Sequence, residues 1–218
     1  MCLTQSLLYK NALFASISHA VMTNILPDLS YEQSWEENHY CFQDISNTTG
    51  VISFYSDYCI CAVRNDERKA LDICQTLEAI KNYLTNDRYD EFVHNTLQYM
   101  QCGTDPRHMH ITAVALIDTS GIRCWSAKGT DQDLSEGMPV GLWTCEEQCK
   151  DFWRDYYDMD SATMDLISSL VEHRMTLDNN KAIIMSVHQT KQIPGNELCT
   201  ECIQSFSELN IQFTDEMY

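Results

Sequence analysis

The segment CTEC, from Cys199 to Cys202, carries the most recognisable spacing for chemistry in the chain. Two cysteines three positions apart, at the start of a helix predicted over 197–208, are typical of a thiol oxidoreductase, because the helix dipole favours a thiolate. Glu197 and Glu201 oppose this, since nearby negative charge raises a thiol pKa. The aromatic residue and proline of thioredoxin-like sites are also absent. The alternative is a pair of packing cysteines.

Zinc binding is the other use of such a pair. Cys145 and Cys149 would share one face of a helix, and together with Cys199 and Cys202 they could offer four thiolates to a tetrahedral Zn²⁺ ion. The spacing of the first pair is wider than in the usual zinc motif, and the glycines and basic residues of a zinc knuckle are absent. The alternative is two separate buried pairs.

A second candidate metal site is the segment HMH. His108 and His110 would lie on the same face of a strand, a spacing suited to one metal ion, and Asp105 or Asp118 could complete the site. The same face continues with apolar residues, so ordinary packing is the alternative. A zinc-stabilised domain or metal enzyme that uses these cysteines or histidines is therefore the second hypothesis for function.

The charge of the chain limits its partners. Lys and Arg number 14 against 32 Asp and Glu, which gives a net charge of −18. Such a surface repels nucleic acids and anionic membranes, and it favours encounter with a basic protein. The alternative is an acidic surface that serves solubility alone. No cofactor is expected, apart from the zinc considered above.

Acidic and aromatic residues alternate in one part of the chain, around 143–160. Aromatic side chains supply contact area at a protein interface, and charges supply steering and register. The alternative is that the aromatic residues form the buried stripe of a helix. The predicted partner-binding residues are Trp143, Asp151, Trp153, Asp155, Tyr157 and Asp158.

The eleven cysteines favour a reducing compartment. A chain of 218 residues can bury a core without disulfides, and the N-terminal segment has neither the basic run of an export signal nor an uninterrupted apolar span. We therefore expect a cytoplasmic protein whose cysteines act mainly as small buried hydrophobes. The absence of the common catalytic motifs favours a non-enzymatic protein, although so many cysteines and histidines leave a catalytic pair open.

The elements that must position these residues follow from hydrophobic periodicity. Residues 3–26 predict an amphipathic helix packed on the body of the protein. Three short runs rich in β-branched and aromatic residues, 39–45, 49–55 and 58–64, predict an antiparallel meander.

The rest of the chain alternates between the two periods. A hairpin is predicted from 108–118 and 121–128, because Thr119-Ser120 separates two period-2 runs. Strands that arrive in meanders favour an α+β fold with a mostly antiparallel sheet flanked by helices, in a single domain over 1–218. Further helices are predicted over 66–84, 87–101, 145–158, 161–177 and 197–208, and further strands over 181–187 and 210–214.

Residues 34–68 resemble the opening of small bacterial proteins of the toxin-immunity type, in which a Trp, an Asn and a Tyr precede a β-meander around a Gly-Val-x-x-Phe strand. The resemblance covers about a sixth of the chain. It implies a cytoplasmic, non-catalytic protein that binds and blocks a cognate toxin. The residues that carry it are Trp35, Asn38, Tyr40, Asp44, Gly50, Val51, Phe54, Asp66 and Arg68.

Overall fold

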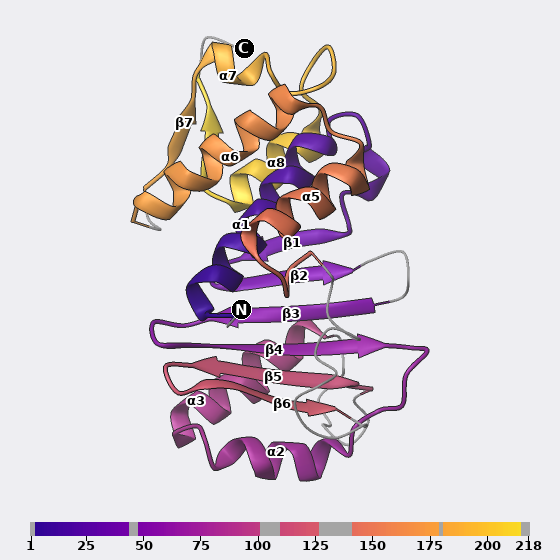
Figure 1. Cartoon of the computed structure of the whole chain (residues 1–218), viewed down its shortest axis with the longest axis vertical. Helices are drawn as coiled ribbons and strands as arrows, with labels where there is room; N and C mark the ends of the chain where they lie inside the picture. The colour runs from indigo at the N-terminus through magenta and orange to yellow at the C-terminus, as the bar shows by residue number, and fades with distance from the viewer. Residues whose placement is uncertain (1–2, 44–47, 101–109, 127–140, 179–180, 215–218) are drawn as a thin grey trace. The chain divides into compact units, whose positions relative to one another are not determined.

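The computed structural model describes residues 3–43, 48–100, 110–126, 141–178 and 181–214. It has the predicted α+β fold (Figure 1). Contacts within the chain divide it into two compact units. The first comprises residues 1–5 and 36–139, and the second comprises residues 6–35 and 140–218. Each unit is thus assembled from two separate stretches of sequence. The prediction of one domain over 1–218 stays a prediction.

The chain forms a six-stranded meander, of which strands β2 to β6 belong to the first unit. The hydrogen-bonded order of the six strands follows the chain, and β2 to β6 pair antiparallel with their neighbours, which confirms the prediction. The first strand was not predicted, because its sequence is polar. The strands are β1 (Gln33–Glu36), β2 (His39–Gln43), β3 (Thr48–Phe54), β4 (Tyr58–Asn65), β5 (Ala113–Asp118) and β6 (Gly121–Ser126).

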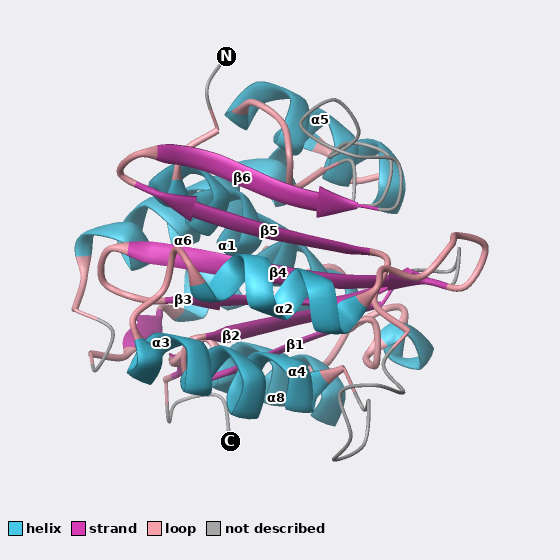
Figure 2. Cartoon of the chain, turned by 90° about the horizontal axis from the view of Figure 1, so that it is seen from below, coloured by secondary structure: helices cyan, strands magenta, loops and turns pink. Residues whose placement is uncertain are grey.

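Short helices pack their apolar sides against this sheet, and Figure 2 shows α2 crossing in front of the strands. They are α2 (Ile73–Lys81), α3 (Asn86–Glu91), the π-helix η2 (Phe92–Thr96) and α4 (Leu97–Tyr99). The last three replace the single helix predicted over 87–101. The core between helices and sheet includes Val51, Tyr58, Ile60, Ala62, Ile73, Leu77, Ile80, Phe92, Val114 and Leu116.

The start of α2 differs from the prediction. A helix is predicted over 66–84, and Asn65 and Asp66 at its start are both of capping type, but α2 begins at Ile73. Its cap is Asp72, whose side chain accepts a hydrogen bond from the N–H of Gln75 at 3.1 Å. A capping residue is recognised by its type, and all of these are good caps. The choice between them is made by tertiary hydrogen bonds.

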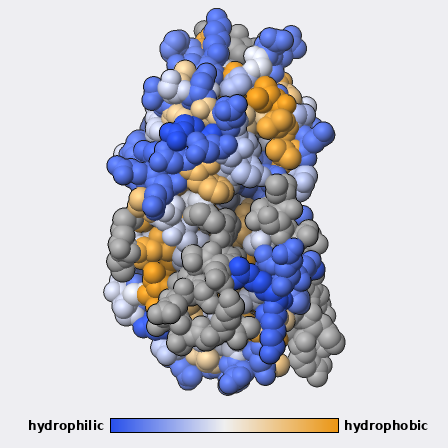
Figure 3. Space-filling model, turned by 45° about the vertical axis from the view of Figure 1, so that its right-hand side comes forward, coloured by the Kyte–Doolittle hydropathy of each residue, from blue (hydrophilic) through white to orange (hydrophobic). Residues whose placement is uncertain are grey.

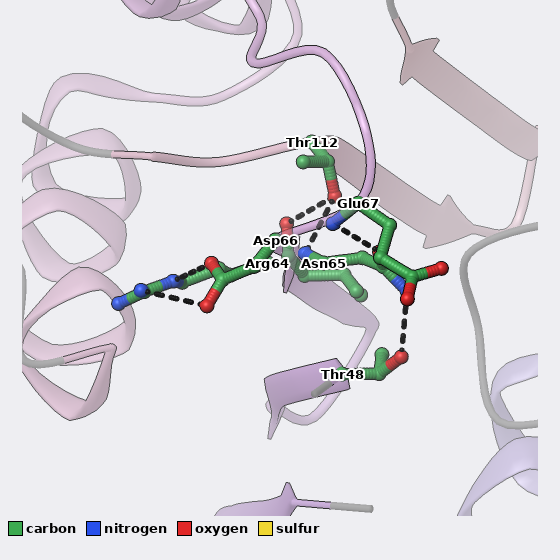
Figure 4. A network of polar contacts seen from close by, with 7 residues as sticks. Thr48, Arg64, Asn65, Asp66, Glu67 and Thr112 are labelled. Atoms are coloured by element: carbon green, nitrogen blue, oxygen red, sulfur yellow. Dashed lines mark hydrogen bonds and ion pairs between the residues drawn. The ribbon is translucent and has the colours of Figure 1, made fainter. Parts of the chain in front are cut away.

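Those hydrogen bonds are drawn in Figure 4, which shows the turn after β4. The side-chain amide of Asn65 donates to the hydroxyl of Thr48 at 2.9 Å, and its backbone N–H donates to the hydroxyl of Thr112 at 3.2 Å. Arg64 forms a bidentate ion pair with Asp66, in which Nε and Nη2 donate to the two carboxylate oxygens at 2.6 and 3.1 Å. The side-chain amide of Asn65 thus joins the end of β4 to the start of β3, and its Oδ1 accepts the N–H of Glu67 at 3.0 Å in a turn that does not continue into a helix.

A close contact between β2 and β3 predicts a large effect of one methyl group. Gly50 lies opposite Phe42 in the register, and a Cβ atom at Gly50 would lie 2.1 Å from Cζ of the Phe42 ring. We expect Gly50→Ala to displace this buried ring and to lower the free energy of unfolding by about 1–3 kcal/mol. Urea denaturation of the two proteins measures the difference.

A double-mutant cycle tests the cause. In a Phe42→Ala background the ring is gone, so Gly50→Ala should cost much less than it does in the wild type. An equal cost in both backgrounds would show that the ring is not the reason why residue 50 is a glycine.

The amphipathic helix predicted over 3–26 is shorter in the structure, and most of it is buried in the second unit. Every residue from Asn11 to Met22 of α1 (Gln5–Met22) is buried. A helix buried all round needs internal partners for its polar side chains. Asn11 has two, because its side-chain amide donates to the backbone oxygens of Leu142 and Thr144, each at 3.0 Å.

The remaining elements of the second unit largely match their predicted places. The predicted strand over 181–187 is shorter than expected, because Ser186 begins the capping box of α7. β7 and β8 pair in parallel and form a separate small sheet. The elements are η1 (Pro27–Leu29), α5 (Glu146–Tyr157), α6 (Ser161–Thr176), β7 (Ile183–Met185), α7 (Val187–Thr190), α8 (Thr200–Glu208) and β8 (Ile211–Phe213).

Candidate functional site

Helix α5 presents a row of carboxylates along one side. Glu147, Asp151, Asp155 and Asp158 are all exposed, and their spacing of four, four and three residues places them on one face. We call these four residues the acidic stripe. Asp158 ends the helix in the left-handed conformation, with φ of 51°. Three of the predicted partner-binding residues, Asp151, Asp155 and Asp158, therefore lie together on the surface.

Two aromatic side chains border the acidic stripe. Phe152 and Tyr156 are half-buried and stack with their ring centroids 6.0 Å apart and their planes 20° from parallel. The hydroxyl of Tyr156 donates to the carboxylate of Glu32, with both oxygens at 3.2 Å. Gly141 leaves room for Phe152, because a Cβ atom there would lie 2.4 Å from its ring. The aromatic pair is thus held in place on the helix.

The opposite side of α5 faces the interior. Trp153 and Tyr157, both predicted as contact residues, are each 6% exposed. The hydroxyl of Tyr157 lies 3.0 Å from Nδ1 of His19. Burial lowers the pKa of His19 to about 4, and the backbone of Ser30 partly offsets this. Burial also raises the pKa of Tyr157. Packing, the alternative considered from the sequence, therefore describes Trp153 and Tyr157, while Trp143 is half-buried.

Ion pairs fix part of the acidic stripe. Arg154 contacts Asp151 at 2.9 Å and Asp155 at 3.1 Å, and all three side chains are largely exposed. Exposed pairs of this kind contribute little to stability. Within the described part of the chain, no ion pair involves Glu147 or Asp158. The stripe keeps a net negative charge and its carboxylates stay accessible.

Those predicted metal ligands that the structure describes do not form one group. The described residues hold no cluster of three or more His, Cys, Asp or Glu side chains that could bind a metal ion. Cys145 occupies the N-cap position of α5 without a capping hydrogen bond from its side chain. Cys149 is buried, and burial raises its pKa to about 12. His110 is half-buried, and His108 lies outside the described residues.

The CTEC motif lies at the start of α8, as the sequence predicts, but the helix begins at Thr200 and makes Cys199 its capping residue. The sulfur of Cys199 accepts a hydrogen bond from the backbone N–H of Cys202 at 3.4 Å. Cys199 is half-buried, and Cys202 is fully buried.

Sequence reasoning missed the residues that support these features from far along the chain. Glu32 accepts a hydrogen bond from Tyr156, which lies 124 positions further along the chain. His19 forms a hydrogen bond with Tyr157, which lies 138 positions further along. Asn24 bonds Cys199 across 175 positions. Their residue types carry no local signal, so only the fold reveals their partners.

A cavity in the first unit was also not predicted. It has a volume of about 460 Å³ and lies between α2 and β6, with Asp72, Gln75 and Trp125 among the residues that line it. These residues are about fifty positions apart, and no spacing rule joins them.

Comparisons with protein-family models, with curated proteins and with solved structures give no match. None of the helices in the described ranges is long and apolar enough to cross a membrane.

Proposed function

We propose that the chain is a non-enzymatic acidic binding protein, and that the acidic stripe of α5 engages a basic protein partner. The observation that carries the proposal is the arrangement of four exposed carboxylates along one helix face, beside a stacked aromatic pair. The net charge of −18 also favours a basic partner, because it accelerates encounter with a positively charged surface.

The surface is also preorganised. A helix fixes the spacing of its carboxylates, and the buried side chains of Trp153 and Tyr157 hold α5 in place on the side that faces the interior. A partner therefore meets side chains that lose little conformational freedom on binding. The aromatic pair Phe152 and Tyr156 can supply apolar contact at the centre or edge of such an interface. On the face shown in Figure 3, the described surface is mostly hydrophilic, with hydrophobic residues in separate patches.

We propose further that the partner is a toxin and that the chain acts as its inhibitor in the bacterial cytoplasm. The support is the resemblance of residues 34–68 to proteins of the toxin-immunity type. Two residues of that motif contact each other, since the side-chain amide of Asn38 donates to the backbone oxygen of Phe54 at 2.8 Å. Asn38 and Phe54 therefore support the meander, and we propose that α5 provides the contact surface.

Charge reversal on the stripe tests the proposal. Proteins that the immobilised chain retains from a lysate of its source would be identified at low salt, and the affinity of a basic candidate measured. We expect Asp151→Lys with Asp155→Lys to weaken that affinity at least about tenfold, because it removes attraction and adds repulsion. Added salt should weaken the wild-type complex in the same way.

A matched control changes the same number of charges elsewhere. Asp165 on α6 and Glu78 on α2 are both exposed, and Asp165→Lys with Glu78→Lys alters the net charge equally. This variant should bind almost as well as the wild type. Equal binding by the stripe variant and the wild type would refute a role for α5, and retention of acidic or neutral partners alone would refute the basic partner.

A further inference from the structure

We propose that Cys199 and Cys202 form a reversible dithiol–disulfide pair, in which Cys199 attacks the disulfide of a co-reactant and Cys202 closes the protein disulfide. This is an activity separate from binding through the acidic stripe. The two cysteines are both free thiols in the structure.

The backbone holds the two cysteines at a bonding distance. Cys199 caps α8, and Cys202 is the third residue of that helix. Helix geometry separates Cα atoms three positions apart by about 5 Å, which lies inside the range of about 4.4–6.8 Å that disulfides span. The sulfur of Cys199 already lies 3.4 Å from the backbone nitrogen of Cys202. Closing the bond therefore needs side-chain rotation and little movement of the backbone.

The two thiols differ in access. Cys199 is half-buried, whereas Cys202 is 0% exposed. Burial raises the pKa of Cys202 to about 12, and the neighbouring Cys199 adds to this. An attacking thiol must be able to reach its co-reactant. Cys199 meets this condition and Cys202 does not, and the sulfur of Cys199 also accepts the N–H of Cys202, so Cys199 is the attacking thiol.

A specific loop holds Cys199 in this place. The side chain of Asn24 accepts a hydrogen bond from the backbone N–H of Cys199 at 2.8 Å and donates one to the backbone oxygen of Pro194 at 2.7 Å. Gly195 has φ of 115°, and a Cβ atom there would lie 2.5 Å from the Asn24 amide nitrogen. The thiol itself lies 3.4 Å from the backbone oxygen of Thr23. Asn24 is thus a positioning residue for Cys199.

The reaction balances without any other oxidant. The Cys199 thiolate attacks one sulfur of a disulfide RSSR, which breaks the S–S bond, forms a mixed disulfide and releases RS⁻, which takes up a proton. Cys202 then loses its proton and attacks the Cys199 sulfur, which releases the second RSH. In sum, the protein dithiol and RSSR give the protein disulfide and two RSH, so the protein loses two electrons and two protons.

The test uses glutathione disulfide as the co-reactant and mass spectrometry as the readout. The tryptic peptide that starts at Gln192 contains Cys199 and Cys202 and no other cysteine. After reaction of the reduced protein and acid quenching, we expect this peptide to lack two hydrogens, and dithiothreitol to restore them. The variant Cys202→Ser should accumulate a mixed disulfide at Cys199, and Cys199→Ser should form neither product in the peptide.

A reactivity control is built into the chain, because Cys74 is exposed on α2. If Cys74 becomes glutathionylated while the Cys199–Cys202 peptide stays fully reduced, the proposal is overturned. The assignment of Cys199 as the attacking thiol would be overturned if Cys202 in the Cys199→Ser variant formed as much mixed disulfide as Cys199 in the Cys202→Ser variant.

The role of Asn24 has a separate readout. In Asn24→Ala the loop loses its anchor, so we expect more mixed disulfide and less closed disulfide in the peptide, while glutathionylation of Cys74 is unchanged. An unaltered ratio of the two products would show that Asn24 supports the fold without positioning Cys199.

Discussion

Acidification is expected to remove about 3 kcal/mol from the stability of the second unit through one residue, His19. Its pKa falls from an ordinary value of 6.5 to about 4 in the folded protein because the ring is buried. Below pH 6.5 the unfolded chain binds a proton at His19 that the folded chain does not, so unfolding becomes easier as the pH falls. The loss should be complete near pH 4, where the folded state also binds the proton.

Urea denaturation at a series of pH values measures this effect, with the difference between wild type and His19→Gln isolating it from the titration of the many carboxylates. The amide of Gln can still meet the hydroxyl of Tyr157 but does not titrate, so the variant should lose less stability between pH 6.5 and pH 4. His173→Gln, at an exposed position on α6, should follow the wild type. Parallel curves for wild type and His19→Gln would contradict the prediction.

The meander could be predicted because its signal is local. Runs of alternating and β-branched residues define β2, β3 and β4, and each predicted strand lies within a few residues of its place. The start of α2 could not be predicted in the same way. Asn65, Asp66 and Asp72 are equally good caps by type. Asn65 caps only a turn, through the N–H of Glu67, and Asp66 pairs with Arg64, whereas Asp72 caps α2.

The burial of α1 shows the limit of periodicity. Its polar residues suggested a solvent-facing side, but the partners of Asn11 and His19 lie more than 130 positions away. A polar residue in a helix marks either an exposed position or a buried one with a partner, and the sequence does not distinguish them.

The two sides of α5 were predictable in part. Cys149, Trp153 and Tyr157 repeat every four residues, and so do the acids from Glu147 to Asp155. Two offset stripes on one helix predict a buried and an exposed face. The alternation of aromatic and acidic residues along the chain predicts a mixed surface that includes Trp153 and Tyr157, whereas the helical period assigns these two residues to the interior.

Loss of the Arg174 guanidinium is expected to have the other large effect on stability. Arg174 lies in the last turn of α6, is 4% exposed, and donates to the backbone oxygens of Lys181 at 2.7 Å and Asp178 at 2.5 Å. Within the described residues no carboxylate pairs with it, so these oxygens and the negative end of the helix dipole balance its charge. Arg174→Ala should lower the free energy of unfolding by about 3 kcal/mol, because it leaves buried carbonyl groups without a donor.

Graded substitution separates hydrogen bonding from charge in this prediction. Arg174→Lys keeps the charge but lacks the rigid planar group that donates to several carbonyl groups at once. Its free energy of unfolding should therefore lie between those of the wild type and Arg174→Ala. Arg154→Ala is the matched control, because Arg154 pairs only at the surface, and its cost should stay below about 1 kcal/mol. If Arg174→Lys were as stable as the wild type, charge alone would hold the segment between α6 and β7. If Arg174→Ala cost no more than Arg154→Ala, the carbonyl groups must find other donors, and the guanidinium would not be what joins the end of α6 to the start of β7.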